Sequence, residues 1–373
     1  MKKIGLVTWT GMGNFGTILQ AYALYSFLKS CGYDCSIINE FDPDNFGIKS
    51  YLKSIANSFG VLNLLERRRV LKWQDSKKYL KVLDFRNKAY KFKKIYSSAQ
   101  YKRMLDDIDV FCSGSDQIWN AYYNFNPFNF LNFAGENKRI SYASSIGTKD
   151  FPKDHEQEIK NMLLDFSHIS LREETGRIAV ENLTGRKDAR VVLDPTFLLT
   201  KDDWSGFGRK GNIEINVPER FIFVYLIGNN KEYENQLKDL SRRIGIENMI
   251  MVPATENPNL KIDGAIEYRF ASPYDFVSLI EQSSWVCTDS FHATALSINL
   301  NKNFTEFLRF KDNDKGSQNS RLYDVLQTYN LQDRLYDKEK DAWAREINFT
   351  HPTEILKELR KDSTKWLINA IEN

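Results

Sequence analysis

Three residues that could carry chemistry, Asp289, Ser290 and His292, directly follow the apolar segment 285–288. The segment predicts a buried strand and the residues from 293 onward predict a helix, so the three side chains would lie at a strand's carboxyl end, where ligands bind in open α/β sheets. His292 would lie in the first turn of the helix, where N–H groups and the dipole attract anions. The set suits a phosphorylated or carboxylated substrate, whereas simple capping or packing by His292 is the alternative.

A second group of polar residues follows predicted strands in the first half of the chain. The strand 109–113 leads into the segment 114–120, which is rich in groups that hydrogen-bond to a sugar or stack on it. The strand 168–173 presents Arg172, a side chain suited to clamping a carboxylate or phosphate through two parallel hydrogen bonds. A surface pair of Arg172 with Glu173 is the alternative interpretation.

The first turn is rich in glycine. Gly11, Gly13 and Gly16 separate a predicted strand, 3–9, from a predicted helix, 17–30, and satisfy the G-x-G-x-x-G pattern. Glu40 follows the next strand, roughly where a ribose-binding acid would lie. A nicotinamide enzyme is therefore a rival hypothesis, but no later segment resembles a hydride-transfer site, and such a turn serves any anionic ligand at a helix N-terminus.

The elements that position these residues alternate between strand and helix along the chain, which predicts two parallel α/β domains. We expect an N-terminal domain at 1–200 and a C-terminal domain at 201–350, beginning with a linker region at 201–217. The segment 351–373 would form a helix that could cross back to the first domain. Two such Rossmann-like domains would face a cleft between their strand ends.

Composition sets further bounds. The 373 residues are 42% hydrophobic and 27% charged, which is ordinary for a globular protein. The four cysteines lack C-x-x-C spacing, and no apolar stretch approaches 18 residues, so we expect a reduced, cytoplasmic protein without a zinc site, a signal peptide or a membrane span. Isolated Asp residues do not define a divalent-metal site, and we expect no metal and no cofactor.

Residues 49–103 differ from the rest of the chain in charge. They contain 16 Lys or Arg and three acids, and their aromatic and aliphatic residues recur at helical spacing. This pattern predicts a pair of basic amphipathic helices inserted into the first domain. A solvated helical face is one interpretation, and contact with anionic lipid headgroups or a lipid-pyrophosphate acceptor is the other. Nucleic acid is not expected, because no recognised binding module accompanies the basic residues.

Six segments together resemble the polysaccharide pyruvyl transferase family, from the first strand to about Leu326. The matching segments are Asn14-x-Gly16-x-x-Leu19-Gln20, Gly114–Trp119, Tyr142–Gly147, Ser170–Glu173, Asp194–Thr196 and Asp289–His292. The resemblance implies a two-domain fold like that of the GT-B glycosyltransferases and a cytoplasmic enzyme of cell-surface glycan assembly. It also implies phosphoenolpyruvate as the donor, contacted by Arg172 and His292.

Roles for the site residues follow from the resemblance and from the chemistry of ketal formation. His292 would be phosphate ligand and candidate general acid, Arg172 the carboxylate clamp, and Asp116 a base or acceptor ligand. The expected substrate-binding residues are Asn14, Gly16, Ser115, Gln117, Trp119, Asp289, Ser290 and Arg321. Family members can place a further basic residue beyond the His motif, and Arg309, Lys311 and Arg321 compete for that role.

Three functions remain open from the sequence. The first is transfer of pyruvate from phosphoenolpyruvate to a glycan or lipid-linked oligosaccharide, in the cytoplasm or at the inner face of the membrane. The second is a nucleotide-sugar glycosyltransferase of the same fold, in which the turn Gly228–Asn229–Asn230 would support a nucleotide diphosphate. The third is a non-catalytic glycan- or lipid-binding protein, with the basic insert carrying the interaction.

Overall fold

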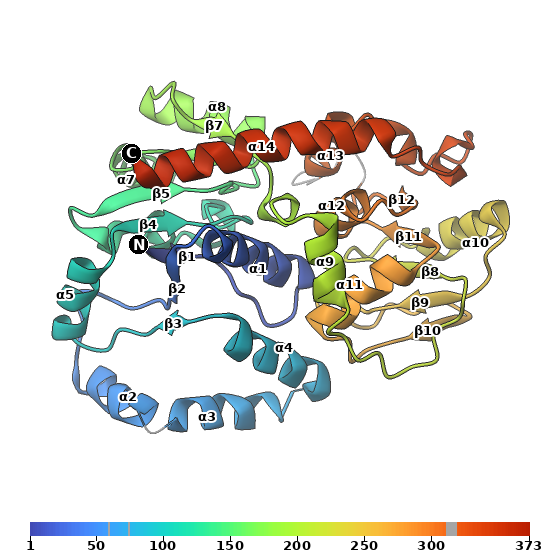
Figure 1. Cartoon of the computed structure of the whole chain (residues 1–373). Helices are drawn as coiled ribbons and strands as arrows, with labels where there is room; N and C mark the ends of the chain where they lie inside the picture. The colour runs from blue at the N-terminus through green and yellow to red at the C-terminus, as the bar shows by residue number, and fades with distance from the viewer. Residues whose placement is uncertain (59, 74, 311–318) are drawn as a thin grey trace. The chain divides into compact units, whose positions relative to one another are not determined.

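The computed structural model describes residues 1–58, 60–73, 75–310 and 319–373 (Figure 1). The chain forms two compact units, neither of which is one continuous segment. Unit 1 comprises Met1–Thr10, Gln20–Leu198 and Asp362–Asn373, and unit 2 comprises Gly11–Leu19 and Leu199–Lys361. Residues 11–19 and 362–373 are therefore grouped differently from the predicted division at residues 200 and 350. Packing explains the first difference, because the Phe15 ring stacks on Phe276 of unit 2 at 4.6 Å.

Unit 1 is built on a parallel sheet with the strand order β3-β2-β1-β4-β5. Two short strands, β6 and β7, pair with each other, and isolated bridges join β6 and the residues before it to β5 and the turn that follows it. The strand bounds are β1 Lys3–Val7, β2 Asp34–Ile38, β3 Phe92–Lys93, β4 Val110–Ser113, β5 Lys138–Ser141, β6 Ser170–Leu171 and β7 Arg190–Val191. The strands β1 and β4 are almost wholly buried, as expected for parallel strands covered on both faces.

Helices connect the strands of unit 1. Their bounds are α1 Phe15–Ser30, α2 Ile48–Ser58, α3 Val61–Val70, α4 Ser76–Ala89, α5 Ser98–Asp107, α6 Ala121–Asn124, α7 Glu156–Leu164 and α8 Glu174–Thr184. The described part of the basic insert thus contains the helices α2, α3 and α4 and the start of α5, rather than the predicted pair. The end of the predicted insert is also not helical throughout, because β3 joins the edge of the sheet beside β2.

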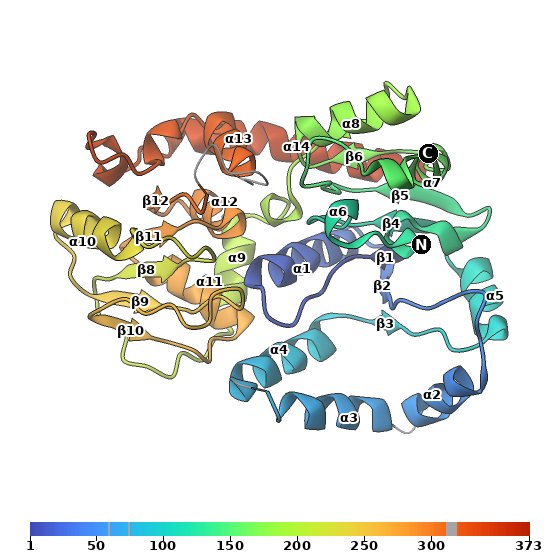
Figure 2. The ribbon, with the colours of Figure 1, turned by 180° about the vertical axis from the view of Figure 1, so that it is seen from behind.

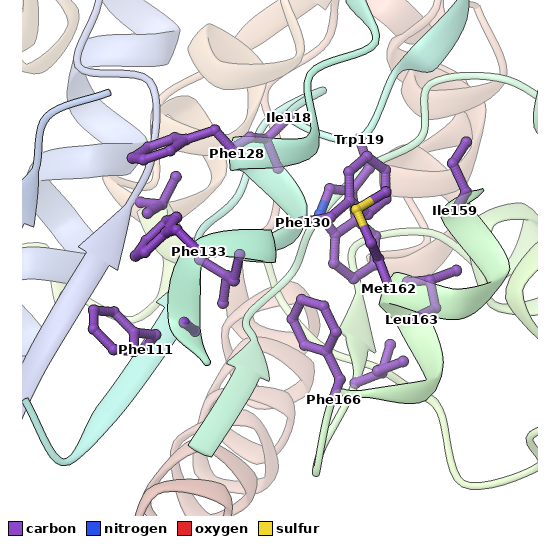
Figure 3. Packing of buried hydrophobic residues seen from close by; sticks show 14 of the residues in the cluster. Phe111, Ile118, Trp119, Phe128, Phe130, Phe133, Ile159, Met162, Leu163 and Phe166 are labelled. Atoms are coloured by element: carbon purple, nitrogen blue, oxygen red, sulfur yellow. The ribbon is translucent and has the colours of Figure 1, made fainter. Parts of the chain in front are cut away.

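An aromatic core lies beneath β4 and β5 in unit 1. Figure 3 shows Phe133 between Phe128 and Phe111, and the Trp119 indole contacts Phe130 and Phe166. The Phe128 and Phe133 rings stack with centroids 4.6 Å apart. Aromatic residues make up 13% of the chain, and many of them fill this core, consistent with the large apolar area that aromatic rings bury.

Unit 2 repeats the same topology with a second parallel sheet of order β10-β9-β8-β11-β12. The strand bounds are β8 Ile222–Tyr225, β9 Met249–Met251, β10 Ala265–Glu267, β11 Trp285–Thr288 and β12 Phe304–Glu306. In both sheets the chain leaves a central strand in one direction and later returns to pair on its other side. The point of reversal lies between β1 and β4 in unit 1 and between β8 and β11 in unit 2, and such points are where α/β folds bind ligands.

The helices of unit 2 include one that the sequence did not predict. Their bounds are α9 Lys201–Gly208, α10 Tyr233–Ile244, α11 Pro273–Gln282, α12 Phe291–Asn299, α13 Ser320–Thr328 and α14 Thr350–Glu372. The expected linker at 201–217 is wrong in its first half, because α9 occupies it. A capping box between Thr200 and Asp203 starts this helix, and Gly208 lets it approach the backbone of Ser278 in α11 closely. Among the described residues, no helix is long and apolar enough to cross a bilayer.

Candidate active site

The reversal point of unit 2 is organised by the fully buried carboxylate of Asp289, directly after β11. Its Oδ1 accepts a hydrogen bond from the Ile227 N–H and its Oδ2 from the Gly228 N–H, both at 2.7 Å. The Tyr233 hydroxyl also donates to Oδ2, at 2.6 Å. Burial and the neighbouring Asp289 raise the pKa of this tyrosine. Asp289 therefore joins the ends of β8 and β11, and its contact with substrate stays a prediction.

His292 lies in the first turn of α12 and is 8% exposed. The helix begins two residues earlier than predicted, because Ser290 takes the extended N-cap conformation. The Ser290 side chain, in the described structure, caps no backbone N–H of this helix. The His292 imidazole thus lies at a helix N-terminus that the Ser290 side chain does not cap. This arrangement is expected of an anion site.

The absence of a side chain at Gly16 leaves space for the His292 imidazole. A Cβ at this position would lie 2.2 Å from His292 Nδ1 and 2.7 Å from its Cγ. Gly16 belongs to the start of α1, which is grouped with unit 2, so the two predicted site residues are neighbours in one unit. The glycine-rich turn therefore makes room for the imidazole ring.

The remainder of the glycine-rich turn also packs on other residues of unit 2. Asn14 caps α1 by accepting a hydrogen bond from the Thr17 N–H at 3.1 Å, and its amide donates to Glu256 at 2.6 Å. A Cβ at Gly13 would lie 2.4 Å from the Thr255 hydroxyl. These glycines face protein side chains closely, an arrangement that does not favour the dinucleotide hypothesis.

A small hollow lies beside the start of α12 and contains two arginines. Its lining includes Asp289, Arg309, Asn319 and Arg321. The Arg309 Nε donates to the Asp289 carbonyl oxygen at 2.8 Å and lies 3.4 Å from its carboxylate. Two of the three basic candidates thus share one hollow, whereas Lys311 lies outside the described residues. Guanidinium groups near a helix N-terminus strengthen the attraction for an anion.

Glu306, at the end of β12, is a polar residue of this region that the sequence did not indicate. It is fully buried and forms a hydrogen bond with the Thr294 hydroxyl of α12. The same hydroxyl lies 3.0 Å from the Ser290 carbonyl oxygen, which can only accept. Burial raises the pKa of Glu306 well above its usual range, and nearby Asp289 raises it further. A protonated Glu306 can donate a hydrogen bond to the Thr294 hydroxyl. The hydroxyl can then donate its own hydrogen to the Ser290 carbonyl oxygen.

In unit 1, four of the predicted motifs meet at the carboxyl ends of the strands. The Ser145 hydroxyl after β5 donates to Glu173 at 2.6 Å. The Ser115 hydroxyl after β4 donates to the Ala143 carbonyl oxygen at 2.7 Å and lies 3.4 Å from Asp194. All of these side chains are buried. Segments separated by up to 79 residues therefore form one polar network, as their positions after parallel strands predict.

Arg172 is the cation of this network. Its Nη1 donates to Asp194 at 3.2 Å and lies 3.9 Å from Asp116, and its Nε lies 3.5 Å from Glu173. Burial acts to lower the pKa of Arg172, but Glu173, Asp194 and Asp116 outweigh it, and the pKa is raised. A surface position, the alternative considered above, is excluded. A donor carboxylate that bound Arg172 would compete with these internal carboxylates.

Asp116 has an unusual backbone conformation. Its φ of 64° is left-handed, as is the φ of 51° at Ala143 in the neighbouring turn. Left-handed non-glycine residues are uncommon and cluster at functional sites. The Asp116 carboxylate accepts a hydrogen bond from the Gln117 N–H at 2.9 Å, and the Asn120 amide donates to the Gln117 side chain at 3.1 Å. Asp116 thus lies beside Arg172 at the carboxyl end of the sheet.

The prediction that Trp119 binds substrate is wrong, because the ring is not placed to stack on a sugar. The side chain is fully buried, and its ring stacks on Phe130 at 5.3 Å (Figure 3). Its indole N–H donates to the Asn129 carbonyl oxygen at 3.1 Å. The residue type suggested a ligand, but the polar atom of the indole is satisfied within the core.

Two further expectations concern ligands of other kinds. Within the described part of the chain, no group of three or more His, Cys, Asp or Glu side chains is placed to hold a metal ion. The turn at Gly228 is closely packed, since a Cβ there would lie 2.5 Å from the Tyr233 hydroxyl. Its N–H donates to Asp289, so this N–H is not available to a nucleotide diphosphate.

The model of the family described as polysaccharide pyruvyl transferase matches residues 14–307. No curated protein gives a significant match. The UDP-GlcNAc 2-epimerase from Neisseria meningitidis, solved bound to UDP-GlcNAc, is 11% identical over 99% of this chain and 100% of that chain, with a TM-score of 0.50.

Two other solved structures are similar at lower scores. The UDP-N-acetylglucosamine 2-epimerase from Rickettsia bellii is 11% identical over 100% of this chain and 97% of that chain, with a TM-score of 0.49. MurG from Acinetobacter baumannii is 8% identical over 100% of this chain and 99% of that chain, with a TM-score of 0.45. The likeness to the Neisseria structure concerns the fold alone. Together with the two parallel sheets it confirms the predicted GT-B-like α/β fold class, whereas the cleft between the domains stays a prediction.

Proposed function

The chain belongs to the polysaccharide pyruvyl transferase family, and we propose that it transfers pyruvate from phosphoenolpyruvate to a sugar of a cell-surface polysaccharide or its lipid-linked precursor. The observation that carries the proposal is the position of His292. His292 lies in the first turn of α12, and Phe291 of the same turn lines a hollow together with Arg309 and Arg321. A phosphate group needs such donors and positive charge.

The proposed reaction forms a ketal and releases phosphate. A proton is added to the vinyl carbon of phosphoenolpyruvate, and two hydroxyl groups of the acceptor sugar form bonds to the neighbouring carbon. The bond from this carbon to the phosphate oxygen breaks. The acceptor loses two protons. In the overall balance, one equals the proton gained by the new methyl group and the other goes to the released phosphate. General acid help in such a step typically contributes ~10²–10⁴-fold, and we assign it to His292.

The proposed roles in unit 1 are those of Arg172 and Asp116. We assign Arg172 to the donor carboxylate and Asp116 to an acceptor hydroxyl. Asp194 and Glu173 fix the direction of the Arg172 guanidinium group. This fixed direction supports the proposal that Arg172 orients the donor carboxylate. Ser115 and Gln117 would contact substrate at the same end of the sheet in unit 1. Asn14 and Ser290 would contact it in unit 2.

The test is donor binding, measured as thermal stabilisation by phosphoenolpyruvate, followed by release of inorganic phosphate in the presence of candidate acceptors. A ligand at about 100 times its dissociation constant adds about 2.7 kcal/mol of stability, which a melting curve resolves. We expect stabilisation of the native protein and its loss in His292→Ala and Arg172→Ala. A uridine diphosphate sugar serves as the competing ligand.

Two matched variants control for the removal of a side chain alone. His351 is an exposed histidine, and Arg177 is a partly exposed arginine paired with Glu174 and Glu181 on α8. Both alanine variants should keep the response to phosphoenolpyruvate. Stabilisation by the nucleotide sugar instead would replace the donor assignment with the glycosyltransferase hypothesis, and an undiminished response in His292→Ala would remove His292 from the site.

A further inference from the structure

The helices α2 and α3 carry apolar side chains on the surface of unit 1. Six of the exposed large apolar residues of the described chain lie between residues 52 and 71, and four of them are leucines. The exposed fractions are 58% for Leu52, 50% for Leu64, 51% for Leu65 and 56% for Leu71. Both Figure 1 and Figure 2 show α2 and α3 on the outside of unit 1, away from β1. Such a concentration of exposed leucines marks an interaction surface.

The helix α3 makes little use of the core of unit 1. It has ten residues, of which Val70 is the buried one. Isolated helices shorter than about 12–15 residues are marginal in water, so α3 depends on contacts with neighbouring elements. It is joined to the next helix by ion pairs, since Arg67 binds Asp84 at 2.6 Å and Arg86 lies 3.4 Å from Glu66.

The helix α4 anchors this region. Its residues Val82, Leu83 and Phe85 are buried, and the Phe85 ring packs 5.8 Å from Tyr22 of α1. The anchor holds α2 and α3 to unit 1 while their leucines face solvent. We call α2 (Ile48–Ser58) and α3 (Val61–Val70), with the following Leu71 and Lys72, the surface arm.

Charge decides which partner fits the surface arm. Residues 49–103 carry 16 basic and three acidic side chains, and Arg68, Arg69 and Lys72 are exposed next to the leucines. A second copy of the chain would bring two strongly positive surfaces together. A nucleic acid would match the charge but would leave the leucines uncovered. An anionic lipid surface offers both negative headgroups and an apolar layer below them.

We propose that the surface arm binds anionic membrane, with Leu52, Leu64, Leu65 and Leu71 entering the boundary between headgroups and acyl chains. The basic side chains then contact the headgroups. This inference goes beyond the proposed function, because it rests on the surface of unit 1 and not on the donor chemistry. It would bring an enzyme of this kind to the membrane that holds a lipid-linked acceptor.

The experiment is vesicle flotation of the full chain with phosphatidylcholine vesicles, with and without phosphatidylglycerol. We expect binding to the anionic vesicles that weakens as salt rises and is weak without phosphatidylglycerol. The double variant Leu64→Ser/Leu65→Ser should bind about tenfold or more weakly, because two apolar side chains no longer leave water. The matched control is Leu164→Ser/Ile178→Ser, which changes two exposed apolar residues elsewhere in unit 1.

Three results would overturn the proposal. The first is no flotation of the native chain with anionic vesicles. The second is equal binding by the Leu64→Ser/Leu65→Ser variant and the control. The third is a dimer, seen by light scattering without lipid, that the same double variant abolishes. Thermal stabilisation by phosphoenolpyruvate, measured on each variant, separates failure of this proposal from failure of the proposed function.

Discussion

The missing side chain of Gly16 determines where His292 can lie. We predict that Gly16→Ala weakens the response to phosphoenolpyruvate, because the added Cβ would lie 2.2 Å from the imidazole and force it to move. A displacement of about 1 Å at a catalytic group can cost about 100-fold in rate. The measurement is the melting temperature with and without phosphoenolpyruvate, together with the rate of phosphate release.

Gly206→Ala is the control for this substitution. Gly206 lies within α9, and its added Cβ would meet Arg209 Nη2 at 3.5 Å, an ordinary contact. Its response to phosphoenolpyruvate should equal that of the native chain, with a small gain in stability from the better helix former. If Gly16→Ala also behaved like the native chain, the position of the imidazole would be irrelevant to the donor.

At the scale of elements, Glu306 joins β12 to α12 through a carboxyl group. Its pKa is raised by burial, so the folded state keeps a proton that the unfolded chain releases above about pH 4.3. The stability contributed by this proton is therefore complete at low pH and falls as pH rises toward the folded pKa. The slope is at most about 1.4 kcal/mol per pH unit.

We predict that Glu306→Gln removes this dependence, since an amide can bond to Thr294 without titrating. Urea unfolding between pH 5 and pH 8 should show the variant gaining stability relative to the native chain as pH rises. The control is Glu354→Gln, at an exposed position on α14. A constant difference between Glu306→Gln and the native chain across this range would mean that Glu306 is ionised in the fold.

Much of the order of elements could be predicted from the sequence, because apolar segments and helix signals are local. The strand 285–288 was predicted with the bounds that the structure has. The helix α9 was missed because three glycines suggested a linker, although Thr200 and Asp203 have the spacing of a capping box. That sequence signal could have located it.

The site was predictable only in part, because burial depends on distant segments. The turns after parallel strands do converge, as Ser145, Glu173 and Asp194 show. The carboxylates around Arg172 could not be inferred from spacing. Glu306 stood in a short apolar segment, and nothing local revealed that its carboxyl group would be wholly buried beside Thr294.

At the scale of the whole molecule, the last residues of the chain complete the core of unit 1. Leu367 and Ile371 are fully buried, and the Ser363 hydroxyl accepts a hydrogen bond from the Leu193 N–H at 3.0 Å. The Tyr33 hydroxyl donates to Glu372 at 2.7 Å. The end of α14 is therefore part of the core of unit 1.

We predict that Leu367→Ala lowers the free energy of unfolding by about 2–5 kcal/mol, the usual range for a leucine removed from a core. The neighbouring Ile368 is 38% exposed and supplies the control, Ile368→Ala, which should cost much less. Urea denaturation measures both. Equal losses in the two variants would contradict the assignment of this helix end to the core.

The division of α1 and α14 between the units has a consequence for how this architecture can be recombined. Phe15–Leu19 and Thr350–Lys361 belong to unit 2, whereas the remainder of each helix belongs to unit 1. A hybrid that took one unit from each of two relatives would need four junctions, after residues 10, 19, 198 and 361, and two of them would cut a helix. A single genetic crossover near residue 199 would separate Gly16 and the last helix turns from the partners with which they evolved.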